Sequence, residues 1–457
     1  MNRKLKENAG IILIVVLFLF IFLLKLNPNA DLWWDSSVYI NMGKYIYSFG
    51  ETGLYEASRP LVWPLLLGFF WKLGLDVIFF GKLMVLLFGA GIIILTYLIA
   101  DEIFHRKVAL IASLMLAFSP VFFLFNSIMF TEIPSTFFIL FGFYFFIKKK
   151  YNPAGMLFGI AFMTRFFQII IIIPIYLFFI YLTVRKKTTI KQIFISLLFF
   201  LLPIIPYLIL NFLLYNNPIY PFQLQAWMAK FTGWIYHQPF DFYLINLVKE
   251  NALILFSILG IVLVLRNEKK YKCIVPFVLL LAFLPYNFAS HKEMRFLIPI
   301  FPFLYILSGY GIVKFSEFFR NHNSTILSII ILIGIIQIHP QLRLNDYDDK
   351  LDTFYNFVKN NKEGVWISNP SFIAYKDIKA EELIYYPLYD LDRIDQLQRN
   401  VDDAKYVLIN TCDILPCPPY EDSCMEEHEN FLNTLKGNFN LYYNKKLDNC
   451  EHYIFTS

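Results

Sequence analysis

Charged residues are scarce in this chain. Of its 457 residues, only 16% are Asp, Glu, Lys or Arg, whereas 58% are hydrophobic, and the mean hydropathy is +0.54. A water-soluble protein cannot bury that much apolar surface, so most of the chain must face lipid. The net charge of +5 lies in short basic loops and not on one face, which argues against nucleic acid as a partner. The composition predicts a polytopic α-helical membrane protein.

Cysteine is also rare, and its positions are uneven. Four of the five cysteines follow residue 411, at Cys412, Cys417, Cys424 and Cys450. Their spacing lacks the paired C-x2-C knuckles of zinc sites, so two disulfides in an oxidising exterior are favoured over a metal site. Three pairings are possible, and the spacing does not choose among them. Cys273, at the predicted cytoplasmic end of a helix, is expected to be a free thiol.

Hydrophobic runs dominate the first 340 residues. A spanning helix needs about 20 apolar residues, or fewer where short helices pair. Runs of this kind occupy 10–26, 78–100, 108–127, 132–147, 190–214, 249–265, 273–288, 296–315 and 325–340. The further block 151–184 has basic residues at both ends and is expected to cross twice, as helices 153–165 and 168–184. This interpretation gives about eleven transmembrane helices.

The distribution of Lys and Arg predicts the orientation. Basic clusters such as 148–150 and 185–187 alternate with connections that carry few positive charges, and basic loops stay in the cytoplasm. The N-terminus is therefore expected inside and the C-terminus outside, in the plasma membrane of a prokaryote. The basic N-terminal segment favours a retained signal anchor over a cleaved signal peptide. The short segment 61–75 is expected to lie in the outer interface.

The composition changes after residue 345. Residues 1–345 form the predicted transmembrane module, with outer loops at 27–77 and 215–248. Residues 346–457 carry no spanning run and alternate helix-like with strand-like stretches. The helix-like stretches are 348–361 and 425–436, and the strand-like ones are 365–368, 405–409, 439–443 and 452–456. These residues predict a small extracytoplasmic α/β domain.

Several charged residues fall at predicted outer ends of helices. They are Asp31, Asp35, Arg59, Glu132, Arg165, His291, Lys292, Glu293 and Arg295. Ionisable groups beside the hydrocarbon are costly and are usually functional. Carboxylates can accept a proton, and the fork of an arginine can bind two phosphate oxygens. Together these residue types indicate a site that handles a phosphate and a proton.

Each candidate also has a structural explanation. Asp35 is a favoured N-cap residue for a helix starting at Ser36. Glu132 at the start of a helix would complement the helix dipole. Arg165 could pair with a lipid phosphate, and residues 291–295 could be a solvated turn.

Four motifs in this order carry a resemblance to a known family. They are Asp35-Ser36-Ser37-Val38-Tyr39 with Gly50 or Gly53 and Arg59-Pro60, then Thr131-Glu132-Ile133-Pro134, then Gly159-Ile160-Ala161-Phe162-Met163-Thr164-Arg165, and then HKEMRFLIPIFP at 291–302. Over about residues 10–320 the chain resembles the superfamily C (GT-C) glycosyltransferases. It is most similar to the dolichyl-phosphate-mannose protein mannosyltransferases and the aminoarabinose transferases of lipid A. It departs from them at Ser36 and Leu61, where the families usually have Glu and Pro, which leaves the acceptor and the subfamily open.

The resemblance implies a reaction and roles for its residues. The donor would be a polyprenyl-phosphate or dolichyl-phosphate sugar, with mannose as the default, and the acceptor an extracytoplasmic protein, lipid or glycan. Asp35 would be the base of an inverting transfer, Glu132 a supporting acid, and Arg59, Arg165 and Arg295 the phosphate ligands. Tyr39, His291, Lys292 and Glu293 are further candidates. No cofactor is implied, although a divalent ion shared by Asp31 and Asp35 stays open, as does the oligomeric state.

Two other functions use the same features. Oligosaccharide transfer, or extension of a lipid-linked glycan, would need the same parts. A transporter or flippase for a lipid-linked or amphipathic substrate is the alternative of a different class. Transporters often have inverted repeats and charges at the bilayer midplane, and this sequence shows no convincing repeat.

Overall fold

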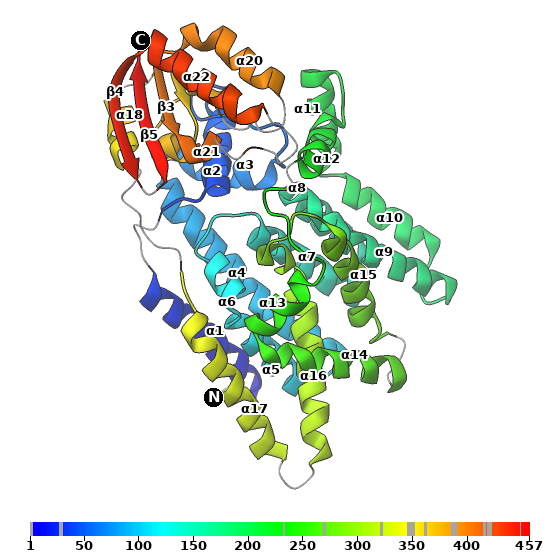
Figure 1. Cartoon of the computed structure of the whole chain (residues 1–457). Coiled ribbons are helices and arrows are strands. Elements are labelled where there is room, and N and C mark those ends of the chain that lie inside the picture. The colour runs from blue at the N-terminus through cyan, green and yellow to red at the C-terminus, as the bar shows by residue number, and fades with distance from the viewer. Residues whose placement is uncertain are drawn as a thin grey trace. The chain divides into compact units, whose positions relative to one another are not determined.

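The structure is a computed structural model that describes most of the chain. The described residues are 3–26, 31–231, 234–267, 271–319, 323–344, 352–360, 363–384, 391–414, 417, 423–447 and 449–457. They form two compact units (Figure 1). The first unit comprises Met1–Pro28, Lys82–Tyr220 and Gln238–Asn345, and the second comprises Asn29–Gly81, Pro221–His237 and Asp346–Ser457. Residues of the predicted outer loops 27–77 and 215–248 therefore cluster with the C-terminal residues.

The first unit is helical. Its α-helices are α1 (Arg3–Lys25), α4 (Val77–Ile103, which starts in the second unit), α5 (Arg106–Ala117), α6 (Pro120–Phe125), α7 (Glu132–Ile147), α8 (Tyr151–Thr164), α9 (Ile169–Val184), α10 (Ile190–Leu201), α11 (Ile205–Tyr215), α13 (Phe242–Glu250), α14 (Phe256–Asn267), α15 (Ile274–Phe288), α16 (Phe301–Phe318) and α17 (Asn323–Ile338). Short 3-10 helices lie at η1 (Phe166–Gln168), η2 (Ala252–Leu255), η3 (Met294–Leu297) and η4 (His339–Gln341).

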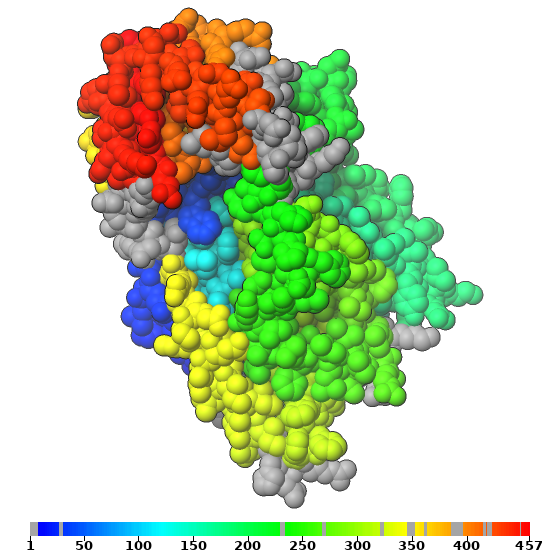
Figure 2. Space-filling model, in the orientation of Figure 1, coloured from blue at the N-terminus to red at the C-terminus, as the bar shows by residue number. Residues whose placement is uncertain are grey.

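Four helical segments in the described part of the chain are long and apolar enough to cross a membrane. They are Asn8–Lys25, Val77–Ile103, Phe166–Val184 and Ser324–Gln341. Two bent pairs raise the number to six if each pair is one span: α10 with α11, and α13 with η2 and α14. Much of the surface of α17 is open in the space-filling view (Figure 2). The predicted total of about eleven spans stays a prediction.

Two of the apolar runs break at a proline. The run 108–127 breaks into α5 and α6, because α5 ends at Ala117 and Pro120 starts a new helix. The run 190–214 breaks into α10 and α11, which meet at 45°. Pro203 lies in this break, and a proline lacks the N–H that would continue the helix.

Glycines let two helices of the first unit approach closely. A Cβ on Gly155 of α8 would lie 2.1 Å from the carbonyl oxygen of Ser196 in α10. A Cβ on Gly159 would lie 2.3 Å from the carbonyl oxygen of Phe200. Any side chain at these positions would push the helices apart. The glycine of the third motif thus has a packing role.

The second unit is built on a five-stranded sheet with the order β2-β1-β3-β5-β4. Its strands are β1 (Val365–Ile367), β2 (Ala380–Leu383), β3 (Tyr406–Asn410), β4 (Asn440–Leu447) and β5 (Cys450–Thr456). Strand β1 pairs parallel with β2 and β3, whereas β5 pairs antiparallel with β3 and β4. Its helices are α2 (Trp34–Tyr47), α3 (Val62–Lys72), α12 (Tyr220–Phe231), α18 (Asp352–Asn360), α19 (Ser371–Ala374), α20 (Leu391–Asn400), α21 (Thr411–Ile414) and α22 (Cys424–Asn438), with a 3-10 turn η7 (Val401–Asp403).

Side chains alternate along the strands, so the sheet has an apolar core on each face. Val407 and Ile409 pack with side chains of α20 and α22 in one cluster. Leu408 packs with side chains of α18 and α19 in the other, together with Leu54. Because Leu54 lies between α2 and α3, a residue from the start of the chain completes a core built by its end.

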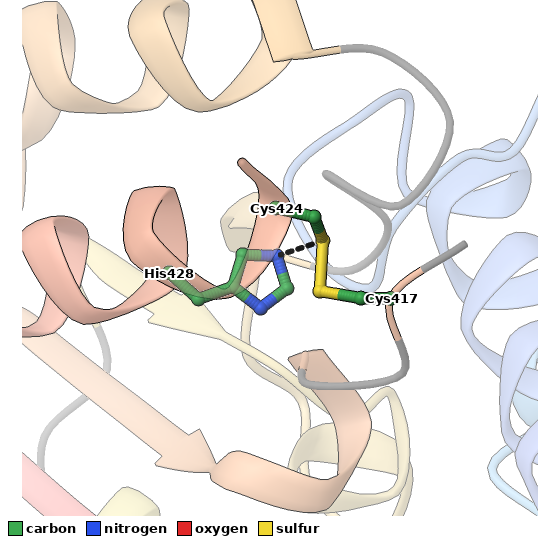
Figure 3. A group of neighbouring side chains, drawn as sticks. All are labelled: Cys417, Cys424 and His428. Atoms are coloured by element: carbon green, nitrogen blue, oxygen red, sulfur yellow. Dashed lines mark hydrogen bonds between the residues drawn. A yellow bond between two sulfur atoms is a disulfide. The ribbon is translucent and has the colours of Figure 1, made fainter. Parts of the chain in front are cut away.

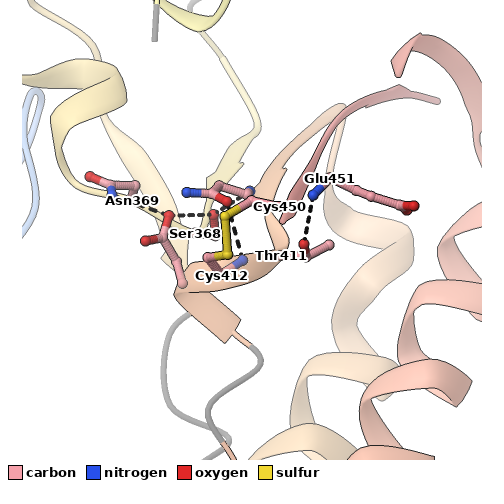
Figure 4. The surroundings of a disulfide bond; sticks show 8 residues. Ser368, Asn369, Thr411, Cys412, Cys450 and Glu451 are labelled. Carbon is pink, nitrogen blue, oxygen red and sulfur yellow. Dashed lines mark hydrogen bonds between the residues drawn. A yellow bond between two sulfur atoms is a disulfide. The ribbon is translucent and has the colours of Figure 1, made fainter. Parts of the chain in front are cut away.

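Two disulfides lie beside the sheet. One joins Cys412 in α21 to Cys450 in β5 (Figure 4), and the other joins Cys417 to Cys424. This is one of the three pairings that the spacing leaves open. Cys273 belongs to neither bridge.

Candidate functional site

Asp35 lies in the first turn of α2, and the structure rules out a role as its N-cap. The helix begins at Trp34, its N-cap is Trp33, and no side chain caps it. An Asp35 oxygen lies 2.9 Å from the Arg59 guanidinium, and both side chains are 20% exposed. The predicted helix start at Ser36 is therefore wrong by two residues, since the helix already includes Trp34 and Asp35. The Asp35 carboxylate is held by an arginine at the surface of the unit.

Arg59 has further contacts that fix its position. Its Nε donates to Glu56 Oε1 at 3.1 Å, and its Nη1 donates to the Tyr39 hydroxyl at 3.4 Å. The guanidinium carbon also lies 5.6 Å from the centre of the Tyr39 ring. Asp35, Tyr39, Glu56 and Arg59 form a group that we call the α2 cluster. Glu56 was missed in the sequence, although its place three residues before Arg59 is a signal for pairing.

Glu132 is the first residue of α7 and is completely buried. Its Oε1 lies 3.0 Å from Arg165 Nη1 and 3.7 Å from Arg295 Nε. Its Oε2 has no hydrogen-bond partner among the described residues. Two arginines from distant parts of the first unit thus meet at the Glu132 carboxylate. We call these three residues, with Glu293 and His291, the α7 cluster.

The two arginines of the α7 cluster are held by other neighbours as well. Arg165 Nη1 donates to Thr131 Oγ1 at 3.1 Å, and Arg295 Nη2 donates to Glu293 Oε1 at 2.7 Å. Both guanidinium carbons lie near the Phe296 ring, at 5.3 and 5.4 Å. Their side chains are 16% and 14% exposed. Two nearly buried guanidiniums therefore share one ring and one carboxylate.

Glu293 completes the α7 cluster, and Lys292 does not join it. Glu293 Oε1 is 2.8 Å from His291 Nε2. Burial alone would raise the pKa of Glu293, but hydrogen bonds from His291 and Arg295, and the Arg295 charge, bring this pKa below its ordinary value. The Lys292 ammonium donates instead to the carbonyl oxygen of Gln238 at 2.8 Å. Its role as a site residue stays a prediction.

One group of three side chains in the described part of the chain has the spacing of a metal site. It consists of Cys417, Cys424 and His428 (Figure 3). The two sulfurs already form a disulfide, and His428 Nε2 lies 3.7 Å from Cys424 Sγ. Burial lowers the pKa of His428 to about 4, so its imidazole is neutral. A disulfide offers no thiolate ligands, so the group as folded is a bridge with a buried histidine beside it.

Solved structures show which fold this is. The chain is similar to ArnT from Cupriavidus metallidurans bound to undecaprenyl phosphate, with a TM-score of 0.67 at 11% identity over 98% of each chain. It is similar to the oligosaccharyltransferase AglB from Archaeoglobus fulgidus in complex with an inhibitory peptide and a dolichol-phosphate, with a TM-score of 0.63 at 12% identity over 98% of this chain and 74% of AglB. The apo form of the Archaeoglobus fulgidus oligosaccharyltransferase matches 89% of this chain and 70% of its own, with a TM-score of 0.63 at 11% identity. The feature that the chain shares with these structures is the fold.

A family model agrees with this fold. The model described as dolichyl-phosphate-mannose-protein mannosyltransferase matches residues 58–210. That segment contains Arg59, Glu132 and Arg165, but neither Asp35 nor the motif at 291–302. No curated protein matches the chain in sequence. The predicted resemblance to superfamily C glycosyltransferases is confirmed.

Proposed function

We propose that this protein is a membrane glycosyltransferase that moves a sugar from a polyprenyl phosphate to an extracytoplasmic acceptor. The observation that carries the proposal is the α7 cluster, in which Arg165 and Arg295 approach one buried carboxylate. Paired, nearly buried guanidiniums suit a phosphate, because each fork can bind two oxygens. Undecaprenyl phosphate in ArnT and dolichol-phosphate in AglB are phosphate lipids of the required class.

The proposed reaction transfers one proton, forms one bond and breaks another. Asp35 takes the proton of the acceptor hydroxyl, whose oxygen attacks the anomeric carbon from the face opposite the phosphate. The new bond joins the acceptor oxygen to that carbon, and the bond from the carbon to the phosphate oxygen breaks, which inverts the configuration. The polyprenyl phosphate leaves with the electron pair, and Arg165 and Arg295 stabilise its charge. Glu132 keeps the two arginines of its cluster in place beside the sugar phosphate.

The remaining features agree with an extracytoplasmic reaction. Two disulfides among the C-terminal residues are typical of an oxidising compartment. We propose that the N-terminus is cytoplasmic and that residues 346–457 lie outside. Mannose is the first sugar to test, and a protein, a lipid or a glycan are the acceptors to compare.

Asp35→Asn tests the base. In proteoliposomes supplied with radiolabelled polyprenyl-phosphate sugars, we expect this variant to lose about 10²- to 10⁴-fold in transfer rate, the usual contribution of a positioned base. Donor binding should persist, because the arginines of the α7 cluster are unchanged. Glu51→Gln is the matched control, since Glu51 is an exposed carboxylate of the same unit, and it should transfer normally. Unchanged transfer by Asp35→Asn would move the role of base to another residue, and a wild type that transfers no sugar would favour the transporter alternative.

A further inference from the structure

One face of α2 is fixed to the segment between β1 and β2. Ser37, Asn41 and Lys44 are four and three residues apart, so they share one side of the helix. Ser37 Oγ lies 2.9 Å from Ser371 Oγ, and Asn41 Nδ2 donates to the carbonyl oxygen of Pro370 at 2.8 Å. All of these groups belong to the second unit, although more than 320 residues separate the partners in sequence.

Lys44 makes the largest set of these contacts. Its ammonium donates to the carbonyl oxygens of Ala374 at 3.0 Å and Lys376 at 2.7 Å, and lies 3.2 Å from Asp377 Oδ1. Its side chain is only 3% exposed. A buried ammonium is costly unless its hydrogens have acceptors, and here three acceptors match its three hydrogens. Lys44 therefore fixes α2 to residues 374–377.

The loop after α2 is fixed to the same segment. The Gly53 N–H donates to the carbonyl oxygen of Ile378 at 2.8 Å, and the Ala380 N–H donates to the carbonyl oxygen of Gly53 at 3.0 Å. Gly53 has a φ of +82°, and a Cβ there would lie 2.2 Å from the carbonyl oxygen of Asn41. Only glycine can occupy this position, where α2, the loop after it and the edge of the sheet come together. Asp377 Oδ1 also accepts from Trp71 Nε1 at 2.8 Å, so α3 joins the same segment.

These contacts surround both partners of the α2 cluster. Asp35 lies on α2, and Arg59 lies between Gly53 and α3. Each of these elements contacts residues 368–380, which we call the α19 segment. We infer that the α19 segment positions Asp35 and Arg59 for sugar transfer, with Lys44 as the main positioning residue. This inference rests on the proposed function, and it gives the C-terminal residues a role in catalysis.

Lys44 acts at a distance from the chemistry. Lys44 is nine positions after Asp35, which is about 14 Å along a helix that rises 1.5 Å per residue. Lys44 therefore holds the helix and does not contact the substrate near Asp35. A displacement of about 1 Å in a reacting group can lower a rate about 100-fold. Loosening α2 should reduce the rate of transfer and leave donor affinity unchanged.

Lys44→Met in the full-length protein tests the inference. Two measurements are made: sugar transfer in proteoliposomes, and hydrogen exchange of the amides of α2. We expect faster exchange within α2 and a 10- to 100-fold lower kcat, with KM for the donor unchanged. Lys445→Met is the matched control, because Lys445 is an exposed lysine on the edge strand β4 of the same unit, and it should change neither quantity. Unchanged exchange, or faster exchange with unchanged kcat, would overturn the inference.

A covalent bond between α2 and the α19 segment provides the rescue. Because Ser37 Oγ and Ser371 Oγ are 2.9 Å apart, the double variant Ser37→Cys/Ser371→Cys should form a disulfide. Added to Lys44→Met, it should restore both kcat and slow exchange when oxidised, and the restoration should disappear on mild reduction. Wild type in the same reductant controls for the native disulfides. An oxidised triple variant that stays slow would count against positioning.

Two results separate this inference from the proposed reaction. If wild type transfers no sugar, the reaction fails, and hydrogen exchange in Lys44→Met still shows whether the α19 segment holds α2. If Lys44→Met does not fold, Asp377→Ala replaces it. That side chain is 61% exposed, so its removal opens no core. Asp377→Ala should change exchange and kcat in the same direction, and no change in either would refute the role of the α19 segment.

Discussion

Replacing Glu132 by glutamine should destabilise the empty protein and strengthen its response to a phosphate lipid. The change keeps the shape of the side chain but leaves Arg165 and Arg295 without the carboxylate that lies 3.0 and 3.7 Å away. At an effective dielectric constant of about 20, a pair of unit charges at these distances interacts by roughly 4.5–5.5 kcal/mol. Removing one partner of a buried pair typically costs about 3–5 kcal/mol, which is the loss of stability that we expect here.

A phosphate would replace the missing charge. If Arg165 and Arg295 bind the donor phosphate, undecaprenyl phosphate should raise the Tm of Glu132→Gln more than that of wild type. The assay is thermal unfolding of both proteins in detergent, with and without the lipid, and with undecaprenol as the uncharged control lipid. Glu102→Gln is the matched control variant, since Glu102 pairs with Lys148 at the surface, where a pair contributes at most about 1 kcal/mol.

Two results would contradict phosphate binding by Arg165 and Arg295. An equal rise in Tm for wild type and Glu132→Gln would mean that these arginines do not hold the phosphate. A rise caused equally by undecaprenol would mean that the isoprenoid chain, and not the phosphate, binds. Either result would remove the main support for the proposed function while leaving the fold unaffected.

Two further predictions concern the sheet of the second unit. Burial raises the pKa of Asp413 from 3.8 to about 7, against hydrogen bonds from Asn369, Ser368 and Asn410, so the folded state binds this proton more tightly than the unfolded state and stability is lost as the pH rises from about 4 to 7. Asp413→Asn should remove this dependence. Its Tm should therefore exceed that of wild type by an amount that grows up to pH 7, where the free energies of unfolding differ by at most about 4 kcal/mol. A constant difference in Tm across this pH range would contradict the assignment. Loop closure predicts that removing the Cys412–Cys450 bridge, with a separation of 38 residues, costs about 4 kcal/mol, and that removing Cys417–Cys424, with a separation of 7, costs about 2 kcal/mol. Unfolding of the paired Cys→Ser variants measures both costs, and the reverse order would exclude loop closure as the dominant effect.

Local patterns predicted the regular elements well where the pattern is strong. The strand-like stretches 365–368, 405–409, 439–443 and 452–456 correspond to β1, β3, β4 and β5. Strand β2 was missed because Ala380–Leu383 is short and contains two glutamates. It is an edge strand, and charged residues are common on edges, where they discourage pairing with other chains. A short charged strand has no alternating apolar pattern to detect.

The sequence predicted the residue types of the candidate site better than their contacts. Charge at helix ends selected Asp35, Arg59, Glu132, Arg165 and Arg295, and the structure pairs each of them with another charged group. The same criterion selected Lys292, whose side chain binds a backbone carbonyl instead. Position in the sequence does not show where a side chain points. Lys44 was not selected, because its acceptors lie more than 300 residues away and leave no local trace.

The second unit also determines when, during synthesis of the chain, α2 can make its final contacts. The partners Ser37 and Ser371 are 334 residues apart, and a ribosome adds roughly 5–20 residues per second. For roughly 15–70 s after α2 has been made, its acceptors at residues 370–377 do not yet exist. During that time Lys44 and Asn41 have none of their final partners, and Leu54 has no core to enter. A nascent or truncated chain that ends before residue 370 therefore contains every residue of the α2 cluster but none of the acceptors that hold α2.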